Sequence, residues 1–197
     1  MLVQSKRISV LVEIALTVAL SAVLSMLAVR LPINFAGGTI SLAMVPIFVL
    51  ALRRGVGAGV AAGMLFGVVD YFVEPFFVAP AQVALDYLVA FGAVGLTGLG
   101  SNAYHRALAV STTRAVAVAV PFMLLGGCAR FLAAWLSGVV FFGMNAPAGQ
   151  PVWLYSIVYN LSYLVPSVVI CAVAATAVLP ALERAVPTSD NAAASCA

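Results

Sequence analysis

Residues 152–180 read VWLYSIVYNLSYLVPSVVICAVAATAVLP and contain no Asp, Glu, Lys or Arg. An α-helix rises 1.5 Å per residue, so about 20 mostly apolar residues are enough to cross the hydrocarbon core of a bilayer. Within lipid every backbone polar group must be bonded internally, and a helix achieves this within one segment. The stretch therefore predicts a membrane-spanning helix.

The composition of the whole chain points the same way. Of its 197 residues 64% are hydrophobic and 8% are charged, whereas soluble domains average about 45–50% and about 25%. Nine Lys or Arg and six Asp or Glu are too few to cover a soluble surface, so we expect lipid to surround the chain. The slight excess of positive charge then reflects loop topology and does not indicate binding to nucleic acid.

Similar apolar stretches recur, and together they predict an all-α integral membrane protein with six transmembrane helices. We expect one membrane domain over residues 1–186 and a flexible C-terminal tail over 187–197, where small and polar residues dominate. The first stretch is longer than the 7–15-residue core of a signal peptide, which indicates a retained helix. The expected spans are 8–29, 39–53, 55–73, 80–101, 115–142 and 152–180.

Basic residues predict the orientation, because Lys and Arg concentrate in cytoplasmic loops. If the N-terminus is cytoplasmic, only Arg30 lies in an outside loop, and Arg130 alone falls within a span. Both termini are then cytoplasmic. The basic residues on the inside are Lys6, Arg7, Arg53, Arg54, Arg106, Arg114 and Arg184.

Two clusters of polar and aromatic residues fall at the same expected depth, near the outer ends of the fourth and sixth spans. Asp86 follows Gln82 by one turn and precedes Tyr87, and Ser156 and Asn160 share a helix face. Convergent polar and aromatic groups at one depth are typical of a small-ligand pocket. The tyrosines beside the second cluster, which could instead form an interfacial aromatic belt, are Tyr155, Tyr159 and Tyr163.

Asp86 is the most informative of these residues, because a carboxylate at mid-membrane costs about 2.5–3.5 kcal/mol even on the mildest scale. Such a group needs a cation. The candidates are Arg130 within the chain and a positively charged ligand. Asp70 and Glu74, at the outer end of the third span, are expected to be solvated.

Two stripes of small residues allow close approach of another helix. Gly55, Gly59, Gly63 and Gly67 recur every four residues, and we interpret them as packing within the fold. Ala15, Ala19 and Ala22 share a face of the first span. For this second stripe, packing within the fold and docking of a partner subunit are equally consistent with the sequence.

Nothing in the sequence favours an enzyme or a metal site. Cys128, Cys171 and Cys196 have no metal-ligand spacing, and His105 is expected to be solvated in a loop. Neither a Ser/His/Asp set at one depth nor a nucleotide-binding loop occurs. A transporter driven by ATP would therefore take its motor from other chains.

Several short segments, in order along the chain, carry a resemblance. They are GGTISL (37–42), MVPIF (44–48), LRRG (52–55) with Ala58 and Gly59, PAQ (80–82), LDY (85–87), AFG (90–92), RFL (130–132), SGVVFFG (137–143), and WLYS (153–156) with Tyr159 and Asn160. In these segments, taken together, the chain resembles the thiamine-specific substrate-binding (S) components of energy-coupling factor (ECF) transporters.

This resemblance implies a six-helix protein of the bacterial plasma membrane that holds thiamine near its outer face under a lid of loops. Thiamine is the cargo, and no cofactor is implied. The resemblance also implies a transmembrane coupling subunit, docked on Ala15, Ala19 and Ala22, and two ATPase subunits. The ligand-binding residues it implies are Asp86, Tyr87, Tyr155, Asn160, Phe76 and Phe142, together with Ser41 and Gly37, where some relatives carry Glu and Trp. Some relatives also carry a His where Ala134 stands, and we expect the adjacent Trp135 to compensate.

These residues suggest a mechanism of capture. Asp86 would pair with the thiazolium cation, and Tyr155, Asn160 and Ser41 would hydrogen-bond the ligand. The aromatic residues expected to stack on its rings are Phe76, Phe142 and Trp135. The alternative function is a solitary proton-coupled carrier of a small cationic metabolite, with Asp86 and Arg130 as the proton relay.

Overall fold

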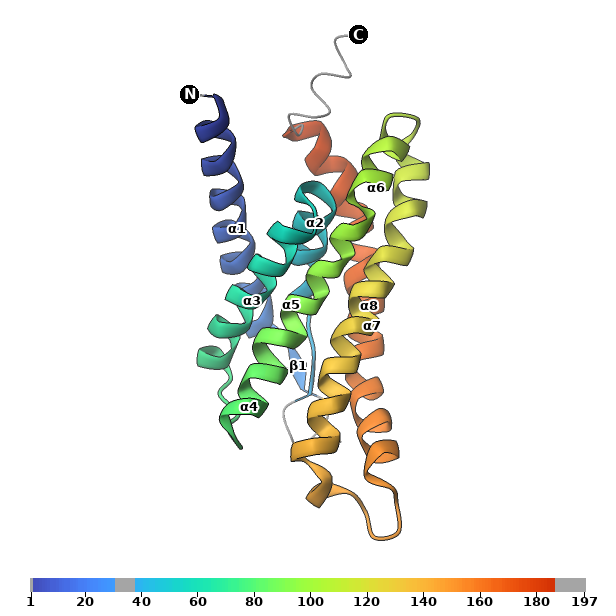
Figure 1. Cartoon of the computed structure of the whole chain (residues 1–197). Coiled ribbons are helices and arrows are strands. Elements are labelled where there is room, and N and C mark those ends of the chain that lie inside the picture. The colour runs from blue at the N-terminus through green and yellow to red at the C-terminus, as the bar shows by residue number, and fades with distance from the viewer. Residues whose placement is uncertain (1, 31–37, 187–197) are drawn as a thin grey trace.

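The computed structural model describes residues 2–30 and 38–186, and within them the chain is almost entirely helical (Figure 1). Gly37 and the expected tail at 187–197 lie outside these residues. A two-stranded antiparallel ribbon pairs β1 with β2. The elements are α1 (Leu2–Met26), β1 (Val29–Arg30), β2 (Thr39–Ile40), α2 (Met44–Arg54), α3 (Val56–Val73), α4 (Pro80–Val83), η1 (Ala84–Val89), α5 (Ala90–Val94), η2 (Gly95–Gly100), α6 (Ser101–Leu108), α7 (Thr112–Phe141), η3 (Gly143–Asn145) and α8 (Val152–Ala185).

Five helical segments of the described chain are long and apolar enough to cross a membrane. Segments α4 to α6 follow one another without a break and count as one of the five. The five are Arg7–Met26, Val56–Val73, Pro80–Leu108, Thr112–Phe141 and Val152–Ala185. They match five of the six expected spans, and they support the prediction of a multi-pass membrane protein.

The second expected span, 39–53, differs from the prediction. Its first residues form β2, which pairs with β1 just after α1, and the helix α2 begins only at Met44. With 11 residues, α2 is about 16 Å long, about half of the hydrocarbon thickness. Pro46 stands in its first turn, where a missing backbone N–H removes no helical hydrogen bond. The apolar run is long enough to cross much of the membrane as a helix, but its first residues pair with β1 as a strand instead.

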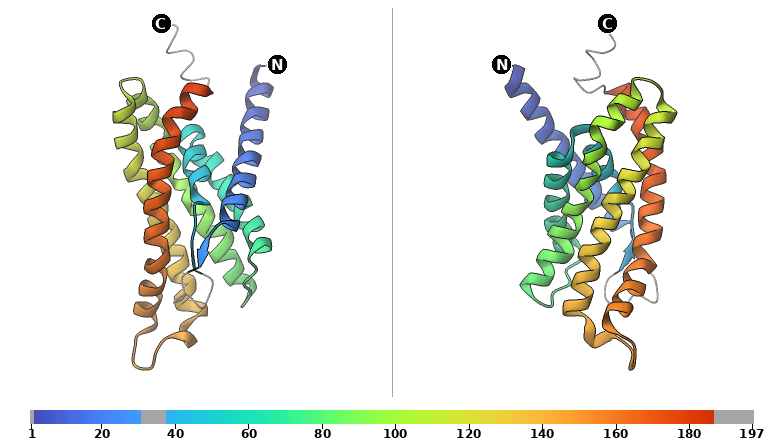
Figure 2. Two further views of the ribbon diagram at one scale, coloured as in Figure 1. Left: turned by 180° about the vertical axis from the view of Figure 1, so that it is seen from behind. Right: turned by 45° about the vertical axis from the view of Figure 1, so that its right-hand side comes forward.

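The helices form an elongated bundle in which the start of α1 and the end of α8 lie at the same end (Figures 1 and 2). Helices α7 and α8 run side by side through much of its length, while α1 lies at the edge. Accordingly, most of the α1 surface is exposed.

The glycine stripe packs α3 against the span that follows it. A Cβ atom at Gly63 would collide with the Phe91 carbonyl oxygen, and one at Gly67 with the Tyr87 carbonyl oxygen. From the opposite side, a Cβ at Gly95 would collide with the backbone of Val60. The interpretation of this stripe as internal packing is confirmed for Gly59, Gly63 and Gly67, whereas Gly55 instead forms the turn between α2 and α3 with a φ of 85°.

We expect Gly63→Leu to lower the midpoint of thermal unfolding in detergent by roughly 6–12 °C, because overpacking against backbone costs about 3 kcal/mol. The matched control is Gly57→Leu on the same helix, where an added Cβ meets nothing within 4 Å. Equal melting midpoints for the two variants would contradict the packing role of the stripe.

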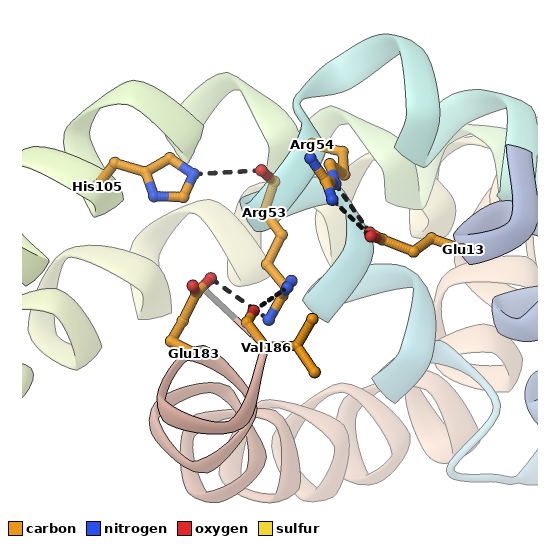
Figure 3. A network of polar contacts seen from close by, with 6 residues as sticks. All are labelled: Glu13, Arg53, Arg54, His105, Glu183 and Val186. Carbon is orange, nitrogen blue, oxygen red and sulfur yellow. Dashed lines mark hydrogen bonds and ion pairs between the residues drawn. The ribbon is translucent and has the colours of Figure 1, made fainter. Parts of the chain in front are cut away.

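A polar network joins four helices beside the end of α8, which lies at the same end of the bundle as the start of α1 (Figures 1 and 3). The Arg54 Nε donates to the Glu13 carboxylate at 2.8 Å. The Arg53 guanidinium lies 3.6 Å from the Glu183 carboxylate and donates to the Val186 carbonyl at 2.8 Å. His105, expected to be solvated, is half-buried, with Nε2 3.2 Å from the Arg53 carbonyl oxygen. The tight Arg53–Gly55 turn thus anchors α1, α6 and α8.

Candidate functional site

A cavity of about 380 Å³ opens near the other end of the bundle, within the usual range for small-molecule sites. Helices α1, α3, α7 and α8, the segments η1 and α5, and the loop after α3 all contribute to its wall. The two clusters expected to converge do meet here, one from α4 and η1 and the other from α8. Lining residues from the two clusters and their neighbours are Gln82, Asp86, Tyr87, Tyr155, Ser156, Tyr159, Asn160 and Tyr163.

Asp86 is held in place by Gln82. The Gln82 Nε2 donates to Asp86 Oδ2 at 2.7 Å, while its Oε1 accepts from the Val78 backbone N–H at 3.1 Å. Gln82 is 1% exposed, so this amide is committed to orienting the carboxylate. Among the described residues Asp86 forms no ion pair, with Arg130 or with any other cation. Its carboxylate is therefore available to a cation that enters the cavity.

Asp86 and Tyr87 lie in η1, which is a π-helical turn inside a longer helix. Such turns are rare and often accompany functional sites. The Tyr87 hydroxyl donates to the Glu74 carbonyl at 2.8 Å and accepts from the Phe76 N–H at 3.1 Å. Tyr87 lines the cavity and also fixes the loop that carries Phe76.

Aromatic rings line much of the cavity wall. Phe76 and Phe142 come from different loops, yet their ring centroids are 5.7 Å apart and tilted by 32°. On α8 the rings of Tyr155, Tyr159 and Tyr163 follow one another with centroids 6.0 and 5.8 Å apart. Such walls suit a flat, cationic ring.

Asn160 and Ser156 bind α8 to α7 as well as line the cavity. The Ser156 hydroxyl donates to the Trp135 carbonyl at 2.9 Å. The Asn160 amide donates to the Ser156 carbonyl at 2.9 Å and accepts from the Tyr163 hydroxyl at 2.6 Å. One lone pair of the Asn160 oxygen remains for a ligand donor.

The remaining expected ligand residues differ in position. Ser41 lines the cavity, and its hydroxyl oxygen accepts from the Ala43 N–H at 3.0 Å. Trp135 is not among the lining residues. Its indole N–H donates to the Trp153 carbonyl at 3.2 Å, and the neighbouring Ala134 faces the cavity in its place. The expectation that Trp135 stacks on the ligand is therefore not supported by its position, and Gly37 lies outside the described residues.

Besides Asp86, three charged residues line the cavity: Asp70, Glu74 and Arg130. Asp70 and Glu74 were expected to be solvated, but both are half-buried in the cavity wall. Asp70 follows Gly67 by three residues and Gly63 by seven, so the spacing of the packing stripe could have placed it on the inward face. The Arg130 guanidinium carbon lies 4.0 Å from the centroid of the Phe91 ring.

The small-residue stripe of α1 is only partly covered by the described residues. Ala15 and Ala19 are exposed and Ala22 is half-buried. Within the described residues no group of three His, Cys, Asp or Glu side chains could hold a metal ion.

Comparison with known proteins identifies relatives along nearly the whole chain. The model of the family described as "Thiamine transporter protein (Thia_YuaJ)" matches residues 11–186. "Thiamine transporter ThiT" of Bacillus subtilis (strain 168) is 40% identical over 173 residues, which cover 86% of this chain and 90% of that protein. "Thiamine transporter ThiT" of Lacticaseibacillus paracasei is 32% identical over 164 residues, which cover 80% of each.

A solved structure has the same fold. ThiT from Listeria monocytogenes superposes with a TM-score of 0.82 at 29% identity, covering 91% of this chain and 97% of that one. The family model, the relatives and the fold agree along the same residues: the chain belongs to the thiamine transporter protein family.

Proposed function

We propose that this chain captures thiamine at the outer face of the bacterial plasma membrane and mediates its uptake as the S component of an ECF transporter. The main support for the proposal is Asp86, a carboxylate that forms no ion pair with any described residue and lines an aromatic cavity in a chain of this family. Both nearby relatives are named thiamine transporters. The family description is that of a transporter, not of an enzyme.

The chemistry of thiamine matches the cavity. Its thiazolium ring is a permanent cation, so it can neutralise Asp86 without any proton transfer. A desolvated contact between a cation and an aromatic face adds about 2 kcal/mol, which Phe76 and Phe142 are placed to provide. We assign hydrogen bonds to the ligand to Tyr155, Asn160 and Ser41, which line the same space.

The proposed topology has six passes and cytoplasmic termini, with α2 and its preceding ribbon as the short second pass. The start of α1 and the end of α8 lie at one end of the bundle, as an even number of passes requires (Figure 2). The polar network around Arg53 and Arg54 lies at that end, in agreement with a cytoplasmic location. The cavity then opens outward.

Transport against a gradient needs a source of energy, which we assign to partner chains. We propose that a transmembrane coupling subunit docks on α1 at Ala15, Ala19 and Ala22, and that two ATPase subunits drive it. The exposure of Ala15 and Ala19 leaves this face open to such a helix.

Isothermal titration of the detergent-purified protein with thiamine tests the binding step directly. We expect saturable binding at one site per chain. An absence of heat and of any quenching of tryptophan fluorescence would overturn the proposed function. Uptake that survives loss of the ATPase subunits but stops with a protonophore would instead favour the solitary proton-coupled carrier.

We expect Gln82→Leu to weaken thiamine binding about 10- to 100-fold, because a hydrogen bond to a charged group contributes about 1.5–3 kcal/mol. Leucine keeps the volume of the buried side chain but releases the Asp86 carboxylate. Asn102→Leu is the control, since Asn102 is exposed in α6, far along the same span. Titration of both variants should separate them, and equal affinities would show that Gln82 does not orient the site.

A further inference from the structure

Charged side chains line the cavity both around Asp86 and around Arg130. Asp86 is bonded to Gln82. Arg130 contacts Phe91, which follows Asp86 by five residues along the same span. By helical rise that spacing places the Phe91 backbone about 7 Å farther along the span than Asp86. Asp70 of α3 and Ser25 of α1 line the cavity as well.

The Arg130 guanidinium lies within electrostatic reach of Asp70 and Asp86 but is not bonded to either of them in the described part of the chain. It makes no hydrogen bond and no ion pair there, and its close contact is the face of the Phe91 ring. A guanidinium carries five N–H donors and no acceptor. Arg130 is half-buried and lines the cavity, so these donors are suited to an acceptor that the cavity receives.

Asp70 complements this donor. It lines the same cavity, half-buried, and forms no ion pair with Arg130 or with any other described cation. An ionised carboxylate only accepts hydrogen bonds. The wall of one cavity thus presents an acceptor and a donor that form no hydrogen bond or ion pair with each other among the described residues.

We propose that Asp70 and Arg130 form a second recognition site for an uncharged group of the ligand that both donates and accepts hydrogen bonds. This inference rests on the proposed function, because it assigns to these residues the part of thiamine that does not carry the positive charge. Thiamine has two such groups, the aminopyrimidine edge and the terminal hydroxyl. Asp70 accepts from the group, Arg130 donates to it, and the Phe91 ring holds the guanidinium in position.

The test measures dissociation constants for three compounds against four proteins. The compounds are thiamine, deoxythiamine, which lacks the terminal hydroxyl, and oxythiamine, in which oxygen replaces the amino group of the pyrimidine. The proteins are wild type, Asp70→Asn, Arg130→Lys and the control Asp86→Asn. Asp70→Asn is nearly isosteric and Arg130→Lys keeps the charge, so the fold is expected to persist, and thermal melting of each purified variant checks this.

We expect Asp70→Asn and Arg130→Lys each to weaken thiamine binding at least tenfold. One of the two analogues lacks the group that Asp70 and Arg130 recognise, and for that analogue the same variants should weaken binding less than threefold. The analogue that responds in this way identifies the recognised group. Asp86→Asn should weaken all three compounds by one common factor, because each keeps the thiazolium ring.

Two results separate the possible failures. If both variants weaken all three compounds by the same factor, or leave thiamine binding unchanged, Asp70 and Arg130 do not recognise an uncharged group and the inference is overturned. If wild-type protein does not bind thiamine at all, the proposed function itself fails.

Discussion

Asp86→Asn is expected to weaken thiamine binding about 10²- to 10³-fold, because removing one partner of a buried charge pair costs about 3–5 kcal/mol. Asparagine keeps the shape of the side chain and can still bond to the Gln82 amide. What it loses is the negative charge that faces the cavity. Titration calorimetry of purified wild type and variant measures the difference.

Asp86→Glu is the matched control, since it keeps the charge and changes only its reach. We expect Asp86→Glu to retain most of the affinity that Asp86→Asn loses. Thiamine binding of wild-type strength in Asp86→Asn would show that the cation is neutralised elsewhere.

Ala19→Phe is expected to abolish thiamine uptake by cells while leaving the affinity of the purified protein within about twofold of wild type. Ala19 is exposed on α1, so we expect the described part of the fold to accommodate a phenyl ring there. Close helix approach requires small residues, and a bulky side chain would separate the coupling subunit from this face.

Ala117→Phe on α7 provides the control for membrane insertion, because Ala117 is also exposed on a long apolar helix. It should leave both uptake and binding intact. Uptake at the wild-type rate in Ala19→Phe would contradict docking of the coupling subunit on this face of α1.

The helices could be predicted largely from the length of the apolar stretches, because within lipid a single segment satisfies its backbone hydrogen bonds only as a helix. Five expected spans correspond to long helices, and the turn at Arg53, Arg54 and Gly55 lies where the polar residues indicated. The second span was wrong at its start. Strand pairing between β1 and β2 depends on contacts across a loop, and apolar length carries no information about such contacts.

The convergence of Asp86 with Asn160 could also be predicted, since each lies at a similar distance from the outer end of its span. Depth follows from residue count and helical rise, but the direction of a side chain around the helix does not. This explains Trp135, which was expected in the cavity but contacts Trp153 outside it. Asp70 was missed because its closeness to the end of α3 suggested solvent, although the stripe before it faces inward.

The role of Arg130 could not be derived from sequence. As the one basic residue within a predicted span, it was a candidate counter-ion for Asp86. In the structure its contact is instead the Phe91 ring, and Asp86 is bonded to Gln82. The choice between two neighbouring partners depends on side-chain positions that periodicity does not define.

If the cargo supplies the counter-ion of Asp86, a structure of the protein determined with bound thiamine should show the two in contact. We expect the thiazolium ring within about 4–6 Å of the Asp86 carboxylate, the range over which opposite charges stabilise each other, and beside the rings of Phe76 and Phe142. A complex in which Asp86 pairs with Arg130 while thiamine lies elsewhere would contradict this expectation.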